Sequence, residues 1–328
     1  MKRIVTGGLV ALLLAALLPA TALAADVALS FTGLTPTFGD APVDITGYAT
    51  PDGTANALTF ASTTPAICTT SGADGEIVTL HKAGSCSITA SQSGNDASDS
   101  FTVAKADPTC AITGYTVAYN AAPHTASGNC LGVDSGILSG LNKSATTHTD
   151  AGTFNNDPWT FADPSGDYNP ASGTVDSAIT PINPDCAITG YNVTFDNANH
   201  TALGDCTGVG AVVLLGLDTS ATTHKDAGTY NGDPWSFHDA NGNYNNDSGT
   251  VDDAISKAAA LCSSITGYSV TYNGSLHTAS GHCFALDGTT QLAGLDLLGT
   301  AHTNAGTYLN DPWTFAGTSN YSNTSYNL

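Results

Sequence analysis

A period-2 alternation of apolar and polar positions returns three times along the last two thirds of the chain. In the first copy, Tyr115, Val117 and Tyr119 are separated by single Thr and Ala residues, which is the spacing of one face of a half-buried β-strand. The second copy has Tyr191, Val193 and Phe195, and the third has Tyr268, Val270 and Tyr272. Later in each copy a Trp and a Phe stand two residues apart, at Trp159 and Phe161, Trp235 and Phe237, and Trp313 and Phe315. We expect strands at both places and each Trp to anchor a small core.

No segment shows a convincing helical period. Gly, Asn, Asp, Pro and Thr separate the apolar runs, and these residues are poor in helix interiors. The best helix candidate is 209–217, but glycine interrupts its counterparts at 136–141 and 291–298. We therefore expect an all-β fold.

Fixed spacings show that the chain contains a tandem array. The opening cysteines of the three copies, Cys110, Cys186 and Cys262, lie 76 residues apart, and a second cysteine follows each after 20, 20 and 21 residues. We place the repeats at residues 105–180, 181–256 and 257–328. Residues 25–104 form a different unit, with strand-like runs at Val27–Phe31, Ala57–Phe60, Glu76–His81 and Cys86–Ala90.

The first 24 residues have the pattern of a secretory signal. Lys2 and Arg3 precede an apolar run that ends at Leu18, and Ala22-Leu23-Ala24 is a small-residue cleavage site. The apolar run is too short for a membrane anchor, and no second hydrophobic span occurs. We expect an exported protein without membrane insertion after cleavage.

The charge of the chain excludes several partners. It has 28 acidic against 7 basic residues, and removal of Lys2 and Arg3 leaves five lysines and a formal charge of −23. Five lysines cannot neutralise a row of phosphates, so the sequence argues against nucleic acid and anionic membrane surfaces as partners.

Eight cysteines in an exported chain predict disulfides. Pairing within each unit gives Cys68–Cys86, Cys110–Cys130, Cys186–Cys206 and Cys262–Cys283. Each closes a loop of about 20 residues, which is worth roughly 3 kcal/mol in the chain-entropy model.

Several motifs resemble repeats of bacterial surface proteins. Thr63-Thr-Pro-Ala-Ile-Cys68 and Ala83-Gly-Ser-Cys-Ser-Ile-Thr-Ala-Ser-Gln92 resemble bacterial Ig-like domains. The three repeats resemble YDG/MBG-type repeats. They share Gly-Tyr-x-Val-x-Tyr-Asn at 114–120 and 267–273, His-Thr-Ala at 124, 200 and 277, and Thr-His-x-x-Ala-Gly-Thr-Tyr/Phe at 147 and 223, with Ala301 replacing Thr in the third. The resemblance implies a bacterial, extracellular or cell-surface spacer or adhesion module without catalysis.

Together these features predict a tandem array of small Ig-like β-sandwich domains. The alternative is a β-grasp-like unit, because 76 residues are few for a seven-stranded Ig domain.

Two sets of residues are candidate ligands of metal ions. The repeated Cys and His residues, for example Cys110, His124, Cys130 and His148, are zinc-ligand types, but the spacing of zinc sites is missing and export favours disulfides. Two acidic loops resemble weak calcium loops, although the bidentate Glu of an EF-hand is absent. Their candidate ligands are Asp163, Asp167, Asp239, Asn241, Asn243 and Asp247. We expect no required cofactor, with Ca²⁺ as the one candidate ion.

The remaining motifs give no catalytic site. The Asp-Pro-Trp segments at 157, 233 and 311 suggest a sugar-stacking platform as an alternative to a core. No nucleophile elbow, GxGxxG or P-loop occurs. We expect a non-catalytic structural or adhesion protein, with a carbohydrate- or calcium-dependent binding module as the alternative.

The third repeat differs from the other two at its C-terminal end. Its sequence stops at Leu328, where Val175 and Val251 stand in the first two repeats, so its closing strand is about four residues short. We expect an open edge there that favours self-association, alongside a surface glycan or protein as other partners. The alternative is that the chain is a fragment of a longer array.

Overall fold

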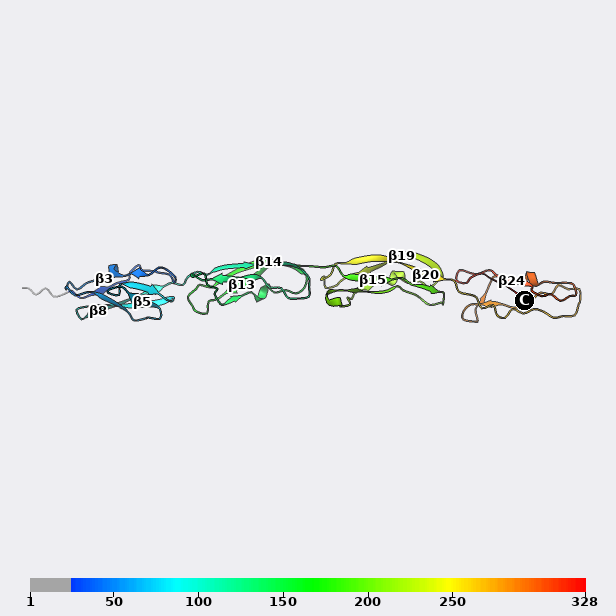
Figure 1. Ribbon diagram of the computed structural model, residues 1–328, viewed down its shortest axis with the longest axis horizontal. Coiled ribbons are helices and arrows are strands. Elements are labelled where there is room, and N and C mark those ends of the chain that lie inside the picture. The colour runs from blue at the N-terminus through cyan, green and yellow to red at the C-terminus, as the bar shows by residue number, and fades with distance from the viewer. Residues whose placement is uncertain (1–24) are drawn as a thin grey trace, which may run out of the picture. The chain divides into compact units, whose positions relative to one another are not determined.

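The computed structural model describes residues 25–328, so the expected signal segment, residues 1–24, lies outside the described residues (Figure 1). The described chain consists of short β-strands and 3₁₀ turns, and no α-helix occurs between residues 25 and 328. The helix candidate at 209–217 forms only a 3₁₀ turn, Val209–Ala211, and then enters a strand at Leu217. The prediction of an all-β fold is confirmed.

The first unit contains three small sheets. Their orders are β1-β3, β2-β6-β5 and β4-β7-β8. The strands are β1 Ala28–Leu29, β2 Val43–Asp44, β3 Ala49–Thr50, β4 Thr59–Ser62, β5 Cys68–Ser71, β6 Ile77–Leu80, β7 Gly84–Gln92 and β8 Asn95–Val103. The alternation of β7 buries Cys86, Ile88 and Ala90 on one face, as the period-2 pattern predicts.

The second repeat shows the repeat architecture most completely. Its larger sheet has the order β16-β20-β19-β18, and its smaller sheet pairs β15 with β17. The strands are β15 Asp185–Thr189, β16 Asn192–Thr194, β17 Leu203–Thr207, β18 Leu217–Asp218, β19 Gly228–Phe237 and β20 Asp247–Ser256. The closing strand, β20, lies between β19, which is antiparallel to it, and β16, which is parallel to it. Ile255 pairs with Val193 across the parallel ladder.

The first repeat has the same two sheets. Their orders are β10-β14-β13-β12 and β11-β9. The strands are β9 Thr109–Thr113, β10 Thr116–Ala118, β11 Ser127–Leu131, β12 Leu141–Asn142, β13 Gly152–Phe161 and β14 Ala171–Thr180. Its closing strand, β14, pairs in parallel with β10 and places Ile179 opposite Val117.

The third repeat has less regular structure. Its strands are β21 Cys283–Phe284, β22 Gln291–Leu292, β23 Leu295–Asp296, β24 Pro312–Phe315 and β25 Thr324–Asn327. β24 pairs with β23 on one side and with β25 on the other. Residues 269–271, which correspond to β16, and residues 306–308, which correspond to the start of β19, are not strands.

The two sheets of a repeat share one apolar core. In the second repeat, Cys206 on the smaller sheet packs in one buried cluster with Phe237 on the larger sheet and with Tyr244, and Cys186, Leu217 and Trp235 are among the residues that pack against it. Phe161, Phe237 and Phe315 are at most 2% exposed. Two sheets that face each other across such a core make a β-sandwich. The tandem Ig-like sandwich is therefore the fold, and the β-grasp alternative is wrong.

The tryptophans differ from the expectation. Trp313 is 5% exposed, but Trp159 and Trp235 are only half-buried. A Cβ on Gly173 would lie 2.7 Å from the ring of Trp159, so glycine lets the ring lie flat against the neighbouring strand. In the third repeat Tyr326 is the cross-strand partner of Trp313 in place of glycine, and the rings are 5.6 Å apart.

The chain divides into two compact units whose boundaries do not follow the sequence repeats. One comprises the described residues up to 113, together with 127–145 and 158–174; the other comprises 114–126, 146–157 and 175–328. No helix in the described part of the chain is long and apolar enough to cross a membrane.

Candidate functional site

Each repeat brings two histidines together through their backbones. His200 and His224 exchange two N–H···O bonds of 2.9 and 3.0 Å, which closes the loops on either side of them into an isolated antiparallel bridge. The same bridge joins His124 to His148 in the first repeat and His277 to His302 in the third. This histidine pair recurs in all three repeats with side-chain partners on both imidazoles, so we take it as the candidate site.

The first histidine of the pair is held by a turn. The Nε2 atom of His200 lies 2.9 Å from Oδ1 of Asp196, whose other contact is the backbone N–H of Ala198. That backbone N–H and the His200 ring hold the pKa of Asp196 below its usual range. Asn120 and Asn273 occupy the position of Asp196 in the other repeats, at the same 2.9 Å from His124 and His277.

The second histidine is held by a carboxylate and a ring. Nε2 of His224 lies 2.7 Å from Oδ2 of Asp233, and the imidazole stacks on Tyr230 with centroids 3.6 Å apart. The first repeat has His148, Asp157 and Phe154 in these positions, and the third has His302, Asp311 and Tyr308. The Asp of each Asp-Pro-Trp segment therefore fixes a histidine.

Buried threonines tie the two loops together behind the histidines. Thr222 is fully buried, and its hydroxyl accepts the backbone N–H of Ala202 at 2.9 Å. The Tyr191 hydroxyl donates to the Thr222 carbonyl at 3.2 Å, and burial raises the pKa of this tyrosine. The first repeat repeats these bonds with Thr146 and Tyr115.

This arrangement orients two imidazoles and holds each of them in place. A histidine–carboxylate pair acts on a nucleophile or a substrate oxygen at its free ring nitrogen. In each repeat the stacked ring covers a face of the second imidazole, and the backbone bridge fixes the loop that carries it. The geometry is repeated three times with only Phe/Tyr and Asn/Asp exchanges, which is what a structural clamp requires.

The sulfur atoms are not available as metal ligands. Disulfides join Cys68 to Cys86, Cys110 to Cys130, Cys186 to Cys206 and Cys262 to Cys283. In the first two repeats the bonded cysteines are cross-strand partners, such as Cys186 on β15 and Cys206 on β17. No group of three or more His, Cys, Asp or Glu within residues 25–328 is arranged to hold a metal ion.

The calcium candidates lie in two equivalent loops. Asp163 accepts backbone N–H groups from Ser165, Asp167 and Tyr168, and Asp239 accepts from Asn241, Asn243 and Tyr244. Burial alone would raise the pKa of Asp163, but the hydrogen bonds outweigh it and the pKa is lowered. Asp247 lies apart, at the start of β20, and accepts the N–H of Ser248. Calcium binding stays a prediction, and an ion would compete with these N–H donors.

The same loops form a junction that sequence reasoning missed. The ring of Tyr244 packs edge-on against Tyr119 with centroids 5.5 Å apart, and its hydroxyl accepts the N–H of Val209 at 2.8 Å. Asn243, next to it, accepts the N–H of Ala151 at 2.7 Å and donates to Asp150. Residues 181–256 are thus joined to the first repeat through one turn.

Equivalent contacts occur on both sides of this junction. Tyr168 packs against Phe38 and Tyr321 against Phe195, each with centroids 5.6 Å apart. Asp167 accepts the N–H of Ala83, and Asn320 that of Ala227. The recurring Asp-Tyr or Asn-Tyr pair was the sequence signal for this junction.

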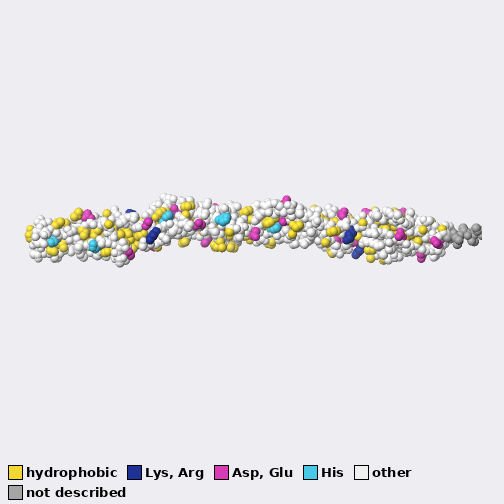
Figure 2. All heavy atoms as spheres, turned by 180° about the vertical axis from the view of Figure 1, so that it is seen from behind, with side chains coloured by type: hydrophobic (Ala, Val, Ile, Leu, Met, Phe, Trp, Pro, Cys, Tyr) yellow, Lys and Arg dark blue, Asp and Glu magenta, His cyan; other side chains and the backbone are white. Residues whose placement is uncertain are grey.

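Acidic side chains are spread over the visible face, with few lysines among them (Figure 2). The carboxylates that pair with histidine are Asp157, Asp196, Asp233 and Asp311, and all four lie outside the two calcium-candidate loops. The acidity of the surface is therefore distributed along the chain and not gathered into one site.

Comparisons with known proteins leave the chain without an assigned family. No protein-family model matches it, and no curated protein matches it. Among solved structures it is similar to Sidekick-1 immunoglobulin domains 1–5, at 13% identity over 90% of this chain and 78% of that one, with a TM-score of 0.25. It is also similar to the four N-terminal Ig domains of Dscam1, at 8% identity over 90% and 96%, with a TM-score of 0.20. Domains 1–6 of the surface layer protein SbsC match at 13% identity over 76% and 32%, with a TM-score of 0.17. At these values we draw nothing about function from them.

Proposed function

We propose that the protein is a non-catalytic, extracellular structural and adhesion protein, in which β-domains that each contain one disulfide act as a spacer and an interaction module. The observation that carries this proposal is the repetition of the junction. Tyrosines of three successive turns each contact an aromatic ring from the repeat or domain that precedes them in the sequence. The pairs are Tyr168 with Phe38, Tyr244 with Tyr119, and Tyr321 with Phe195, with ring centroids 5.5 to 5.6 Å apart. The contacts between successive repeats recur as regularly as the contacts within them. This regularity supports a function in which the joined series of domains is what matters.

The chemistry of each unit supports the same function. The histidine pairs are bound by backbone bonds, carboxylates and stacked rings, and every cysteine is in a disulfide. Disulfides are typical of proteins in oxidising compartments, which agrees with the secretory pattern of residues 1–24. We further propose that the repeats belong to the YDG/MBG type and that the protein is secreted to a bacterial surface. The shared motifs and the recurring disulfide support this assignment.

One observation favours a second candidate, a carbohydrate-binding module. Trp159 and Trp235 are half-buried, so part of each indole is available to stack on a sugar ring. Both indoles lie against glycines of the closing strands, Gly173 and Gly249.

A glycan array together with a calorimetric calcium titration separates the two candidates. We expect no saturable signal from the mature chain in either experiment. Saturable glycan binding that is lost in a Trp159→Leu/Trp235→Leu variant and kept in a Trp313→Leu variant would replace the spacer function with the binding module. Saturable calcium binding that Asp163→Asn and Asp239→Asn abolish would make the module calcium-dependent.

A further inference from the structure

Asn273, the turn residue beside the first histidine of the third repeat, has two hydrogen-bond donors on its side-chain oxygen. Its Oδ1 atom accepts the backbone N–H of Ser275 at 2.9 Å and lies 2.9 Å from Nε2 of His277. Because the N–H of Ser275 identifies Oδ1 as an acceptor, Nε2 of His277 carries a hydrogen and donates it. Two donors on one carbonyl oxygen stabilise the negative charge that develops there when its carbon is attacked.

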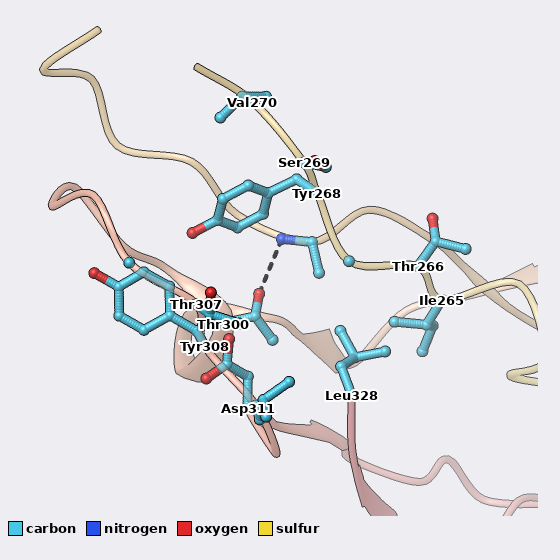
Figure 3. A pocket seen from close by; sticks show the side chains of 14 residues that line it. Ile265, Thr266, Tyr268, Ser269, Val270, Thr300, Thr307, Tyr308, Asp311 and Leu328 are labelled. Carbon is cyan, nitrogen blue, oxygen red and sulfur yellow. Dashed lines mark hydrogen bonds between the residues drawn. The ribbon is translucent and has the colours of Figure 1, made fainter. Parts of the chain in front are cut away.

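The loop that carries His277 is fixed at several points. The backbones of His277 and His302 exchange N–H···O bonds of 3.0 and 2.9 Å. The N–H of Ala279 donates to the hydroxyl of Thr300 at 2.9 Å, which is the dashed line beside the ring of Tyr268 in Figure 3. The His277 imidazole also contacts that ring, with centroids 5.6 Å apart. The imidazole donor is therefore held in place before any reaction begins.

The residue that follows Asn273 supplies a nucleophile. Gly274 has a φ of 75°, and a Cβ built on it would meet no atom within 4 Å. Its backbone N–H makes no hydrogen bond to any of the described residues. Because glycine has no side chain, this nitrogen can approach the Cγ atom of Asn273 without hindrance.

The other two Asn-Gly pairs of the chain, at residues 231–232 and 241–242, lack this arrangement. The N–H of Gly232 donates to a carboxylate oxygen of Asp252 at 2.9 Å. The N–H of Gly242 donates to the carbonyl of Asp239 at 3.2 Å. No donor within residues 25–328 reaches the side-chain oxygen of either asparagine. Both glycine nitrogens are therefore engaged, and neither amide is polarised.

The first repeat forms the same turn with a different residue beside the amide. Oδ1 of Asn120 accepts the N–H of Ala122 at 3.0 Å and lies 2.9 Å from Nε2 of His124. The next residue is Ala121, at a φ of 61°. Its methyl group hinders the approach of its own nitrogen to the neighbouring amide. The donors are thus present in the first repeat without the glycine.

The second repeat has a carboxylate at this position. Asp196 accepts the N–H of Ala198 and lies 2.9 Å from Nε2 of His200. The turn therefore accommodates a carboxylate in place of the amide, with both donors kept.

We propose that Asn273 is a self-modifying site, at which the turn hydrolyses the side-chain amide without an enzyme. The Gly274 nitrogen loses its proton to water or hydroxide, and its electron pair forms a bond to Cγ of Asn273. The resulting oxyanion on Oδ1 is stabilised by Ser275 and His277. Its collapse breaks the bond from Cγ to Nδ2, which takes up a proton and leaves as ammonia. Water then opens the cyclic imide at either of its carbonyl groups and gives aspartate or isoaspartate.

The aspartate product reproduces the turn of the second repeat. The new carboxylate keeps both donors and converts the bond from His277 into a charge-assisted one. The isoaspartate product instead adds a methylene group to the main chain and displaces the turn. This inference goes beyond the proposed function, because a spacer does not require the reaction.

Peptide mapping by mass spectrometry tests the proposal. The oxidised mature chain is incubated alone in neutral buffer, and conversion of Asn to Asp and isoaspartate is followed at residues 120, 231, 241 and 273. We expect Asn273 to react first, at least about tenfold faster than the other three. The blocked peptide Tyr-Asn-Gly-Ser-Leu, residues 272–276, lacks the histidine and should react more slowly than the same residues in the folded chain.

Two variants test the two parts of the turn. His277→Phe removes the imidazole donor and keeps a ring beside Tyr268, so it should slow the reaction at Asn273 at least about tenfold. Hydrogen exchange at residues 277–279 checks that the loop is retained. Ala121→Gly is the matched gain of function, because it places glycine beside an amide whose donors are already present. It should raise the rate at Asn120 toward that at Asn273.

The opposing results leave the spacer function untouched. Reaction at Asn231 or Asn241 as fast as at Asn273 overturns the proposal, because the Asn-Gly sequence alone would then set the rate. Equal rates in the folded chain and the blocked peptide overturn it for the same reason. An unchanged rate in His277→Phe with the loop retained also overturns it. If that variant loses the loop, Ala121→Gly decides, and an unchanged rate at Asn120 overturns the proposal.

Discussion

At the scale of single residues, equivalent positions of the repeats hold different side chains that make the same hydrogen bond. Asp253 is 1% exposed, its Oδ1 accepts the Tyr191 N–H, and its Oδ2 has no hydrogen-bond partner in the described residues. Ser177 serves the same N–H in the first repeat with a neutral hydroxyl. The second repeat therefore retains a buried carboxylate oxygen that the first repeat avoids.

We expect Asp253→Ser to stabilise the second repeat by about 1–2 kcal/mol, because it keeps the acceptor and removes an unsatisfied buried oxygen. Hydrogen exchange at the most protected amides of residues 185–256 should slow by about tenfold. The reciprocal variant, Ser177→Asp, should accelerate exchange in the first repeat. Faster exchange in Asp253→Ser would show that the carboxylate has a stabilising partner.

A second residue-scale prediction concerns acid. The hydroxyl and N–H of Thr290, with the N–H of Thr289, lower the pKa of Asp287 to about 2. Because the unfolded value is about 3.9, the contribution of this turn is present above about pH 4 and is lost as the pH falls toward 2. Amide exchange in the β21–β22 hairpin should accelerate over that window, and Asp287→Asn should flatten the dependence. An unchanged profile in the variant would contradict this assignment.

At the scale of elements, the neighbour of each strand decides how far its side chains are buried. Trp313 faces Tyr326, whereas Trp159 faces Gly173 and Trp235 faces Gly249. The alternation of apolar residues in the sequence does not show which residue lies on the opposite strand. For this reason the tryptophans of three identical Asp-Pro-Trp motifs differ in their exposure.

We expect iodide to quench the fluorescence of Trp159 and Trp235 readily and that of Trp313 weakly. Three variants that each keep a single tryptophan, with Phe at the other two positions, measure this separately. Trp313→Ala should cost about 3–5 kcal/mol, the range of a buried aromatic, and Trp235→Ala less. Equal quenching of all three would contradict the role of glycine in exposing the indole.

The disulfides are also element-scale features, since each closes a loop within one unit. Replacing Cys110 and Cys130 together by Ser removes the bond between β9 and β11 without leaving a free thiol. This should destabilise the first repeat by roughly 3 kcal/mol for a loop of about 20 residues. Exchange in residues 262–328 should stay within error, and a comparable loss of protection there would show that the repeats do not unfold separately.

The strands and the cysteine pattern were predictable from sequence, while the contacts that define the candidate site were not. Period-2 spacing located β10 and β16 because their apolar side chains alternate. Their parallel pairing with strands about 60 residues later depends on tertiary contacts that leave no local signal. The pairing of His224 with Asp233 and Tyr230 likewise follows from the bulge at Gly232, where the backbone adopts a φ of 74°. The Tyr244 junction left only a recurring Asp-Tyr or Asn-Tyr pair in the sequence.

At the scale of the whole molecule, the same few contacts recur from one repeat to the next. The disulfide, the histidine pair and the junction tyrosine occur in all three repeats. The contacts that join one repeat to the next are therefore a property of the whole series.

Single-molecule pulling on the oxidised mature chain tests the central claim that the protein is a series of separately folded repeats, each closed by one disulfide, that bear load. We predict separate unfolding events that recover when the load is removed. After reduction each step should lengthen by roughly 70 Å, because about 20 residues are released at up to ~3.6 Å each. A single event for the whole chain, or steps of the same length before and after reduction, would contradict the account.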